Sequence, residues 1–557
     1  MIAMANELDR DRETEWRRIA VIVDGLGSSV TELSDRIWEL AETKFEEFAS
    51  AKLLADRLEQ TGFAVERGIG GLPTAFMASY GCGPGGPVIA LLGEYDALPG
   101  LSQQDGIATP EAATDGGNGH GCGHHLLGAG SLAAAIALKE YMVETGLPGT
   151  IRYYGCPAEE GGSGKTFLVR EGAFEGVDAA LTWHPGYGNA VVSMTSSANY
   201  QVRYRFHGRS AHAAASPHQG RSALDAVELM NVGANYMREH VPPETRFHYA
   251  VTDTGGFSPN VVPATAEVVY LIRAPKVRDV KAVYARINDV ARGAALMTGT
   301  EVNIRFEKAC SNLIPNVALE RVMYRCFQAL GVPAFTEAER RYAAAIAATL
   351  RPEPAGAGEA GAPGGQSGLS GLSEPAGPAA DPVSPAADPA DPAGPVGPAD
   401  PLVLADPADP ASQTDPAAPS APAASSLPPD SPALPETLDP YAPLTGRMLG
   451  STDVADVSWI VPTAQLETVC FAADTPFHSW QMVAQGRSSA AHKGMLHAAK
   501  VLAATGAELL RQPALLEDAK RELRSSGGLE GYVCPIPPDV RPPVKADREK
   551  PLRQEAP

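Results

Sequence analysis

The stretch Gly119-His120-Gly121-Cys122-Gly123-His124-His125-Leu126-Leu127-Gly128 combines four Cys or His side chains with four glycines. Thiolate and imidazole groups bind zinc-like metals best, and glycines allow the sharp turns that bring two such ligands to one centre. The Ala- and Leu-rich residues 126–141 that follow predict a buried helix. We therefore expect a ligand loop that leads into the N-terminus of a core helix, where the helix dipole favours the thiolate form of Cys122. A free cysteine beside surface histidines is the alternative, and the rest of the chain must decide between the two.

Length, charge and cysteine content narrow the class of protein. The 557 residues are enough for two or three domains, and 44% hydrophobic residues is ordinary for a soluble globular protein. A net charge of −21 argues against nucleic acid or an anionic membrane as a partner. The seven cysteines are odd in number and form no Cys-x-x-Cys pair, which favours a reducing compartment.

The N-terminus and the apolar segments predict where the protein resides. Residues 1–18 are charged throughout, unlike a secretory signal peptide. No apolar run is expected to reach the roughly 20 residues that a membrane span needs. We therefore predict a cytoplasmic protein without a membrane partner.

Short apolar runs alternate with helical patterns in the first part of the chain. Residues 88–93, 150–155 and 178–183 are apolar runs between turn signals, and helical spacing lies before and between them. This order predicts buried parallel strands. A further strand at residues 465–471 and a helix at residues 488–512 resume the pattern. The predicted fold class is therefore α/β, with a mainly parallel sheet.

A different pattern lies between the two α/β parts. Strand, helix, strand, strand, helix and strand are expected at residues 200–206, 221–239, 248–254, 267–273, 277–297 and 301–306. This β-α-β-β-α-β order is the ferredoxin-like arrangement of a small α+β domain. Because the α/β pattern resumes afterwards, we predict that this domain is an insertion at residues 196–308.

Residues 352–443 have the composition of a disordered segment. Pro, Ala, Asp, Gly and Ser dominate, Lys and Arg are absent, and Tyr441 is its single aromatic residue. Such a stretch cannot bury a core, so we predict a solvated, acidic, disordered insertion. The α/β domain would then consist of three parts, at residues 1–195, 309–351 and 444–557, the last with a C-terminal tail.

Metal-binding or acid/base side chains follow the predicted strands of the sheet. They are Glu94 and Asp96 after the first strand, Glu159 and Glu160 after the second, His184 at the end of the third, and His478 after the late strand. In open α/β sheets, ligands bind at the carboxyl ends of the strands, and the loop with Cys122 leads to the same edge. One such residue could be chance, but their agreement at four strand ends indicates a site.

The donor atoms of this set suit two metal ions. Nitrogen, oxygen and sulfur ligands would come from Cys122, His124, Glu160, His184 and His478. Two ions about 3.5–4 Å apart need a bridging ligand, which a thiolate or a carboxylate can provide. Such a pair activates a water and polarises a carbonyl, and a general base then moves the proton. In the doublet Glu159-Glu160, one carboxylate could bind metal while its neighbour stays free as the base; a solvated surface pair is the alternative.

Two motifs point to other chemistries. Residues 162–166 (GSGKT) resemble the end of a phosphate-binding loop, but the glycine required five residues before Gly164 is Glu159, whose carboxylate would repel phosphate. Cys122 with a histidine could also be the nucleophile of a thiol protease. The many ligand-type residues around it favour a metal over a free nucleophile, although sequence alone leaves this alternative open.

Several motifs together resemble those of a known family. They are GEYDALP (93–99), GHGCGH (119–124), PAEEGG (157–162), HGRSAH (207–212), and GSTD (450–453) with HSWQ (478–481). The chain thus resembles the dinuclear-metal aminoacylase and carboxypeptidase family of metallopeptidases. Within that family it is similar to the amidohydrolase branch of p-aminobenzoyl-glutamate hydrolase and the plant auxin-conjugate hydrolases. The Pro-rich segment is not a feature of the family.

The resemblance implies a role for each candidate residue. The metal ligands would be Cys122 in the bridging position, His124, Glu160, His184 and His478. Glu159 would be the general base, which takes a proton from water and later gives it to the leaving amine. His212, on the inserted domain, would reach a partner's active site and stabilise the oxyanion, unless it is simply a surface histidine on a turn. Asn260 and Arg273 would hold the substrate carboxylate.

Two positions depart from the family pattern. His125 stands where many relatives have Asp or Asn, and it could either support a ligand or serve as an extra donor. Glu94 stands where more distant relatives place a metal-binding His, so Glu94 and Asp96 are expected to support the ligands rather than to bind metal.

The predicted function is that of a metal-dependent amidohydrolase or peptidase. Its substrate would be an N-acyl amino acid, an aminobenzoyl-glutamate-like conjugate or a small dipeptide, and its cofactors two zinc or manganese ions. In the family the small domain closes over the site and dimerises, which predicts a homodimer through residues 196–308. A non-catalytic binding protein that keeps the fold is the alternative, although no ligand and no base is missing from the sequence. A scaffold built on the Pro-rich segment is a weaker one.

Overall fold

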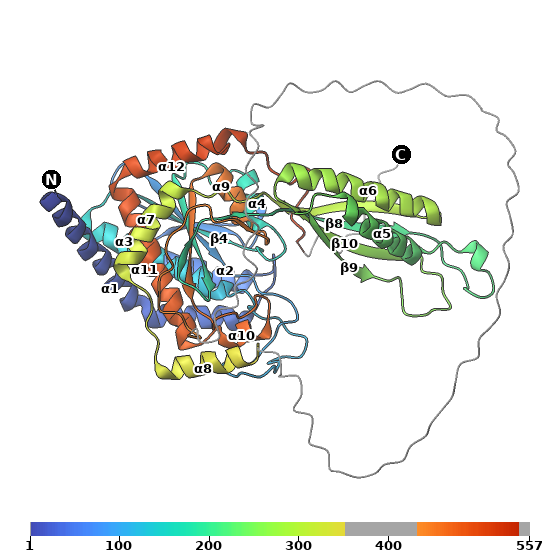
Figure 1. Ribbon diagram of the computed structural model, residues 1–557, viewed down its shortest axis with the longest axis horizontal. Helices are drawn as coiled ribbons and strands as arrows, with labels where there is room; N and C mark the ends of the chain where they lie inside the picture. Colours follow the sequence, from blue (N-terminus) through green and yellow to red (C-terminus); the bar gives the residue numbers. More distant parts are fainter. Residues whose placement is uncertain (1, 351–431, 545–557) are drawn as a thin grey trace, which may run out of the picture. The chain divides into compact units, whose positions relative to one another are not determined.

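The computed structural model describes residues 2–350 and 432–544, with side chains from residue 12 onward (Figure 1). Residues 352–431 of the predicted insertion therefore lie outside the described residues. The described chain contains a seven-stranded sheet covered by helices, a four-stranded sheet with two helices, and one short two-stranded pairing. The short pairing joins β7 (Thr195–Ser196) and β12 (Arg447–Met448) in parallel.

The seven-stranded sheet has the strand order β1-β2-β4-β3-β5-β13-β6. Its strands are β1 (Ala64–Arg67), β2 (Phe76–Cys82), β3 (Val88–Glu94), β4 (Gly149–Cys156), β5 (Ala179–Gly186), β6 (Ala190–Val192) and β13 (Thr463–Val469). The four central strands β4, β3, β5 and β13 pair in parallel, as the apolar runs of the first three predict. Their carboxyl ends therefore lie along one edge of the sheet.

The prediction of a mainly parallel sheet is correct only for this centre. β2 pairs antiparallel with β4, β1 pairs antiparallel with β2, and β6 pairs antiparallel with β13. β1 is short and largely exposed, and β6 has only 3 residues. Such outer strands bury too little apolar surface to produce the apolar run by which a central strand is recognised. The sheet is therefore mixed.

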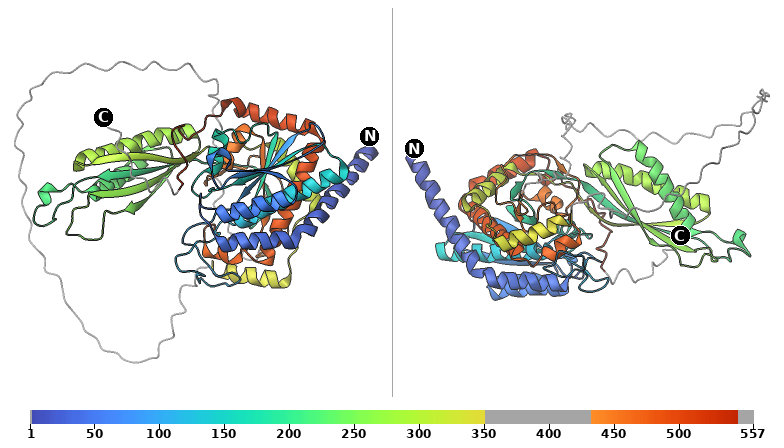
Figure 2. Two further views of the ribbon diagram at one scale, coloured as in Figure 1. Left: turned by 180° about the vertical axis from the view of Figure 1, so that it is seen from behind. Right: turned by 60° about the horizontal axis from the view of Figure 1, so that its bottom comes forward.

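Helices cover both faces of this sheet (Figure 1; Figure 2). One layer contains α1 (Ile2–Leu40), α2 (Phe48–Gln60), α3 (His124–Thr145), α7 (Val317–Leu330), α11 (Ser489–Arg511) and α12 (Pro513–Ser525). The other face is covered by α4 (Gly164–Arg170) and α9 (Val454–Ile460). Successive side chains of a strand point to opposite faces of the sheet: Leu91 packs against the first layer of helices, and Leu92 against the second. A smaller core includes residues of α8 (Glu337–Ala348) and α10 (Trp480–Gln485).

Helix α3 lies at the centre of the larger layer. It begins after Gly123 (φ 78°) and ends before Gly146 (φ 67°), and glycine adopts a positive φ without strain. An 18-residue window of α3 has a mean hydropathy of 1.4, enough to cross a membrane by length and composition, which corrects the prediction that no apolar run is long enough. Since 83% of that window is buried inside the protein, against α1, α11 and the central strands, its apolarity is that of a core helix.

Residues 198–310, termed the inserted segment, form the four-stranded antiparallel sheet. Its elements are β8 (Ala198–His207), α5 (Ala223–Met237), β9 (Arg246–Asp253), β10 (Thr265–Ala274), α6 (Val277–Thr298) and β11 (Glu301–Cys310). The strand order is β11-β8-β10-β9, and α5 and α6 lie together on one face of the sheet (Figure 2). Val202, Tyr204 and Phe206 are buried under these helices. The order of elements is the β-α-β-β-α-β order that the sequence predicts.

The predicted disordered insertion ends earlier than residue 443. Leu434 is only 2% exposed and belongs to the core with α8 and α10. Asn189 Nδ2 donates to the Pro435 carbonyl at 3.2 Å, and Tyr441 Oη donates to Glu320 Oε2 at 2.7 Å. Residues 432–443 therefore pack against the α/β part, because the Leu and Tyr that they contain find buried partners, which corrects the predicted boundary.

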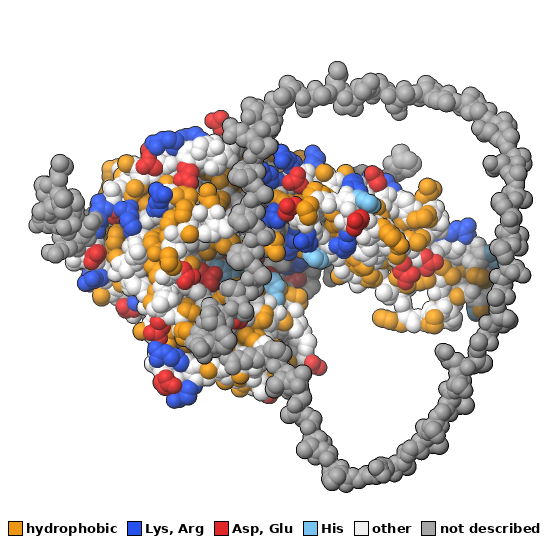
Figure 3. Space-filling model, in the orientation of Figure 1, with side chains coloured by type: hydrophobic (Ala, Val, Ile, Leu, Met, Phe, Trp, Pro, Cys, Tyr) orange, Lys and Arg blue, Asp and Glu red, His pale blue; other side chains and the backbone are white. Residues whose placement is uncertain are grey.

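The charged side chains of the described residues are spread over the surface. On the face shown in Figure 3, acidic and basic side chains are interspersed with apolar ones. The charge of −21 is thus not gathered into one block on that face.

Replacement of Leu132 tests the position of α3 in the core. Leu132 is 0% exposed, so Leu132→Ala should lower the free energy of unfolding by about 2–5 kcal/mol through lost burial and a new cavity. Val143 on the same helix is 57% exposed, and Val143→Ala should change it by less than about 0.5 kcal/mol. Urea denaturation followed by circular dichroism measures both changes, and equal effects would contradict the packing of α3 described above.

Candidate metal centre

The parallel strands deliver polar side chains to one edge of the sheet. These are Glu94 and Asp96 at the end of β3, Glu159 and Glu160 after β4, His184 near the end of β5, and His478 in the loop after β13. The loop before α3 adds Cys122 to the same place. The edge therefore collects the residue types that the sequence places at the strand ends.

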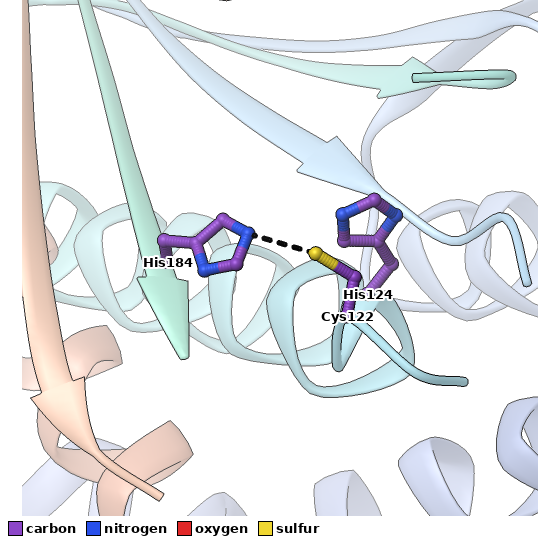
Figure 4. A group of neighbouring side chains, drawn as sticks. All are labelled: Cys122, His124 and His184. Atoms are coloured by element: carbon purple, nitrogen blue, oxygen red, sulfur yellow. Dashed lines mark hydrogen bonds between the residues drawn. The ribbon is translucent and has the colours of Figure 1, made fainter. Parts of the chain in front are cut away.

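Cys122, His124 and His184 form the first group of donors (Figure 4). One donor atom from each lies within 4.8 Å of the other two, and Cys122 Sγ is 3.4 Å from His184 Nε2. The loop can approach β5 because Gly123 has no side chain: a Cβ there would lie 2.7 Å from Pro185 Cγ. The glycines of the opening stretch thus permit the contact between the ligand loop and the sheet.

Cys122, Glu160 and His478 form the second group, again within 4.8 Å of one another. His478 Nε2 is 3.2 Å from Glu160 Oε2. His478 has a φ of 61°, which is unusual for a residue with a side chain, and its backbone N–H donates to the Gly121 carbonyl at 2.8 Å. Because Cys122 belongs to both groups, its sulfur lies where a ligand shared by two ions would lie.

Asp96 and one backbone carbonyl orient the donors. Asp96 Oδ1 is 2.9 Å from His124 Nδ1, and its Oδ2 accepts the backbone N–H of Glu160 at 2.9 Å. The Nδ1–H of His184 donates to the Pro185 carbonyl at 2.9 Å. With the proton on Nδ1 in both rings, each Nε2 presents a lone pair to the first group, as metal ligation requires.

The groups have the properties expected of a cation site. Two buried atoms, His124 Nε2 and Glu160 Oε1, have no hydrogen-bond partner among the described residues. Leaving such atoms unsatisfied is costly, and a bound cation would satisfy both. Although burial opposes it, the hydrogen bond from His478 lowers the pKa of Glu160 to about 2, so this carboxylate is ionised. One thiol, three imidazoles and one carboxylate fit zinc-like divalent ions.

The helix dipole alone does not make Cys122 a thiolate. Burial, followed by the charge of Glu160, raises the pKa of Cys122 well above its usual value. The expectation that the N-terminus of α3 favours the thiolate is therefore wrong in the absence of a cation. A divalent ion at the shared position would supply the positive charge that the thiolate needs. The electrostatics thus favour a metal site over a thiol protease.

Glu159 lies at the same edge without joining either cysteine group. Its carboxylate lies within 4.8 Å of donor atoms of Glu94 and His124. The residue before it, Ala158, has a φ of 61° and sets its direction. Burial and then the charges of Glu94 and Asp453 raise the pKa of Glu159 well above its usual value. A carboxyl group in such surroundings takes up a proton readily, as a general base that later acts as an acid must.

A buried ion-pair network lies behind the donors. Lys165 Nζ is 2.6 Å from Glu94 Oε1 and 2.6 Å from Asp453 Oδ1, and all three residues are 3% exposed or less. Glu94 Oε2 is in turn 3.2 Å from His124 Nε2. Sequence reasoning missed Lys165, although a lysine close behind Glu160 at the start of an otherwise apolar helix is a signal. Since Lys165 is buried in these pairs, it does not bind phosphate, which agrees with the rejected phosphate loop.

Four of the five donors, all but His124, line a cavity of about 560 Å³ that the inserted segment also borders. Arg273 of β10 lines this cavity, and its Nη1 donates to Ser451 Oγ at 3.0 Å. The structure therefore brings the predicted carboxylate-binding arginine to the same cavity as the metal-type side chains. A cavity of this size suits a small molecule.

His212 and Asn260 are not among the residues that line the cavity. Both are exposed and lie in neighbouring loops of the inserted segment, where the Ala213 N–H donates to the Asn260 carbonyl at 3.0 Å. His212 Nδ1 accepts the N–H groups of Ala214 and Ala215 at 3.2 Å each, which leaves the proton on Nε2. Within one chain, the structure does not bring these two predicted residues to the donors.

His125 belongs to neither donor group. Its Nε2 donates to the Gly486 carbonyl at 3.0 Å, and its ring lies 4.8 Å from the ring of His120. His125 therefore supports the ligand loop from the side of α3 and is not an extra donor.

A parallel sheet that presents thiol, imidazole and carboxylate groups to a small-molecule cavity is the arrangement of a metal-dependent hydrolase. Residues 90–337 match the peptidase family M20/M25/M40. The chain is 46% identical over 516 residues to one of the p-aminobenzoyl-glutamate hydrolase subunits of Escherichia coli (strain K12), across 92% of this chain and 96% of that one. The chain therefore belongs to peptidase family M20/M25/M40 and is a metal-dependent amidohydrolase, which confirms the resemblance noted in the sequence.

Other relatives and a solved structure agree with this assignment. The Xaa-Arg dipeptidase of Mus musculus is 34% identical over 315 residues, which are 54% of this chain and 68% of that one. A different p-aminobenzoyl-glutamate hydrolase subunit, also of Escherichia coli (strain K12), is 29% identical over 322 residues, 50% of this chain and 73% of that one. A protein of methicillin resistant Staphylococcus aureus, described as an aminohydrolase, has the same fold, with a TM-score of 0.53 and 14% identity over 89% of this chain and 99% of that one.

Metal content tests the shared position of Cys122. Protein purified without chelator should contain about two divalent ions per chain by elemental mass spectrometry. Cys122→Ser should lose metal from both groups because the thiolate is common to them, whereas Cys82→Ser in β2, outside both groups, should keep the full content. No bound metal in the wild-type protein, even after reconstitution with zinc or manganese, would contradict the site.

Proposed function

We propose that the protein hydrolyses the amide bond between an aroyl or acyl group and an amino acid, with a p-aminobenzoyl-glutamate-like conjugate as its main substrate. N-acyl amino acids and small dipeptides are further candidates. The observation that carries the proposal is the 46% identity, over nearly the full length, to a relative whose name states that substrate. The two donor groups around one small-molecule cavity support catalysis rather than binding alone.

Two zinc or manganese ions are the proposed cofactors. Cys122, His124 and His184 would hold one ion, and Cys122, Glu160 and His478 the other. Ions held in this way activate a water and polarise the scissile carbonyl. Thiolate and imidazole donors suit zinc, and the carboxylate also suits manganese.

The protein's own side chains would move the proton and position the substrate. Glu159 would accept a proton from the attacking water and give it to the amine nitrogen as the C–N bond breaks. Arg273 would bind the carboxylate of the amino acid through its planar fork and so place the amide beside Glu159. Both residues line the same cavity, which supports this division of roles.

The inserted segment is proposed to act as a lid and as an assembly surface. His212 and Asn260 are exposed and line no part of the cavity in their own chain, so they are proposed to act at the cavity of another chain. There the Nε2–H of His212 would stabilise the oxyanion, and Asn260 would help to hold the substrate carboxylate.

The partner in that assembly is proposed to be a second, homologous kind of protein. The sequence predicts a homodimer, but two relatives from one organism are named as different subunits of p-aminobenzoyl-glutamate hydrolase. These names favour a heteromer over the predicted homodimer. A cytoplasmic location also remains a proposal, supported by seven free cysteines.

Replacement of the base tests catalysis. Glu159→Gln should keep its metal and lower kcat on p-aminobenzoyl-glutamate by about 10²–10⁴-fold, because the amide cannot take up the proton. Glu171→Gln, at an exposed position after α4, is the matched control and should keep wild-type turnover. Retained turnover in Glu159→Gln would remove Glu159 from this role. A fully metallated wild-type protein that binds the conjugate but forms no product would favour the non-catalytic alternative.

Native mass spectrometry tests the assembly. If the homodimer prediction holds, the purified chain alone should form a homo-oligomer. If the heteromer proposal holds, addition of a homologue of the other hydrolase component should shift the chain to a mixed complex. His212→Ala should lower turnover in the assembled protein without loss of metal. A chain that stays monomeric and fully active would contradict both assemblies.

A further inference from the structure

The face of the four-stranded sheet opposite to α5 and α6 forms one wall of the cavity. Directly paired residues of neighbouring strands share a face of the sheet. Asn199 of β8 pairs with Arg273 of β10, and Gln201 pairs with Leu271. All four residues line the cavity, so the end of this sheet that is nearest to the donors is the part of the inserted segment that borders the cavity.

A bulge in β11 decides which side chain that strand adds to the wall. Phe306 pairs with Val202, and Lys308 pairs with Gln201, so Glu307 has no cross-strand partner in β8. Regular alternation would pair Glu307 with Gln201 and turn Lys308 to the helix-covered face. The extra residue therefore adds Lys308 to the face that carries Gln201, while the Glu307 carboxylate stays on that face, bonded to Gln201 and Arg203.

Glu307 is held by other partners and leaves Lys308 without a counter-charge. Arg203 Nε donates to Glu307 Oε1 at 2.8 Å, Gln201 Nε2 donates to its Oε2 at 2.9 Å, and Arg305 Nη2 donates to Oε1 at 2.7 Å. Although burial opposes it, the bond with Arg203 lowers the pKa of Glu307 to about 2. This fixed carboxylate anchors the bulge and therefore the direction of the next side chain.

Lys308 itself has no partner of its own in the described chain. The residue is 7% exposed and lines the cavity, and its ammonium group forms neither a hydrogen bond nor an ion pair with another described residue. Its Nζ is not among the buried atoms that lack a partner, so the ammonium group is accessible from the cavity, and no described carboxylate pairs with it. The position therefore favours an anionic group that enters from the cavity.

Two acidic residues on the other walls, Glu467 and Glu320, are engaged in hydrogen bonds. Glu467 Oε1 accepts the backbone N–H groups of Tyr187 and Gly188 at 3.2 and 3.1 Å. Glu320 Oε2 accepts the hydroxyl group of Tyr441 at 2.7 Å. Neither carboxylate forms an ion pair with a described residue, so neither neutralises the ammonium group.

Asn199 adds an unpartnered polar atom to the same wall. It is 2% exposed, and its Nδ2 donates to Cys310 Sγ at 3.1 Å. Its Oδ1 has no hydrogen-bond partner among the described residues. Buried amide oxygens are normally satisfied, so this atom is suited to accept an N–H group of a ligand.

We propose that Lys308 determines specificity by binding a carboxylate on the side chain of the substrate's amino acid, while Arg273 binds the α-carboxylate. β10 and β11 lie on either side of β8, about 10 Å apart, so the long side chains of Arg273 and Lys308 can converge on a small dicarboxylate. The substrate class is thus an N-acyl amino acid with an acidic side chain. This inference rests on the proposed function and adds the group that distinguishes an acidic from a neutral amino acid.

Paired substrates of equal size test the inference. The wild-type, metal-loaded protein should show a kcat/KM for p-aminobenzoyl-glutamate about 10–100-fold above that for p-aminobenzoyl-glutamine, as expected for a charge-assisted hydrogen bond. Lys308→Met keeps the apolar stem and removes the charge, so this ratio should fall to about 1, mainly through a higher KM for the glutamate conjugate. Lys308→Arg should restore much of the preference.

Two controls separate specificity from folding and from catalysis. Lys281→Met removes the same charge from an exposed position in α6, on the helix-covered side of the sheet, and should leave the ratio unchanged. Calorimetry with free glutamate and glutamine measures binding without turnover. Glutamate should bind more tightly than glutamine to the wild type, and this difference should disappear in Lys308→Met.

The outcomes distinguish the inference from the proposed function. If the wild type cleaves both conjugates equally, or if Lys308→Met keeps the preference, the role of Lys308 is wrong while the hydrolase function stands. If the metal-loaded protein cleaves neither conjugate, the proposed function fails and the calorimetry decides about Lys308. Equal binding of glutamate and glutamine would then overturn the inference, and a glutamate preference that is lost in Lys308→Met would support it.

Discussion

The carboxylate of Asp96 is the interaction on which the site depends. One of its oxygens holds the ring of His124, the first residue of α3, and the other holds the backbone N–H of Glu160, after β4. Asp96 itself follows β3, so a single side chain connects three segments that are distant in sequence. Because both of its oxygens are engaged at 2.9 Å, a shift of any one segment would disturb both donor groups. The seven-stranded sheet supplies the rigid edge that this connection requires.

Charge balance explains why such a site is built around cations. Glu94, Asp453 and Glu160 lie in a small buried region, and Lys165 offsets the first two through contacts of 2.6 Å. The remaining negative charge of Glu160 and of a Cys122 thiolate has no comparable lysine or arginine partner among the described residues. Buried charges are stable only when they are compensated, so bound metal and folded structure support one another. The same argument accounts for the raised pKa of Cys122 in a metal-free chain.

The sequence predicts the fold and the site best where the same pattern recurs from strand to strand. The central strands β3, β4 and β5 are apolar runs with ligand-type residues at or just after their carboxyl ends, and parallel pairing then brings His184 and Glu160 to one edge without further information. The outer strands β1, β2 and β6 lack such a run, and the packing of Leu434 depends on partners far away in sequence. The helix N-terminus alone predicts a thiolate at Cys122, but burial outweighs that contribution. These features could not be predicted for the same reason: each depends on contacts with residues that are distant in sequence.

On the cavity wall formed by the inserted segment, strand pairing decides the position of a single side chain that the sequence alone does not predict. The register shift between Phe306 and Lys308 puts Lys308 on the face of Gln201, where regular alternation along β11 would turn it to the helix-covered face. A bulge of this kind leaves no signal in composition or periodicity, because Glu and Lys are equally polar. The metal-type donors come from the α/β part, whereas Arg273 and Lys308 come from the inserted segment. With the proposed roles, catalysis and recognition of the amino-acid side chain would be carried by different parts of the chain, and the register of one strand would change the charge that the substrate meets without moving a donor.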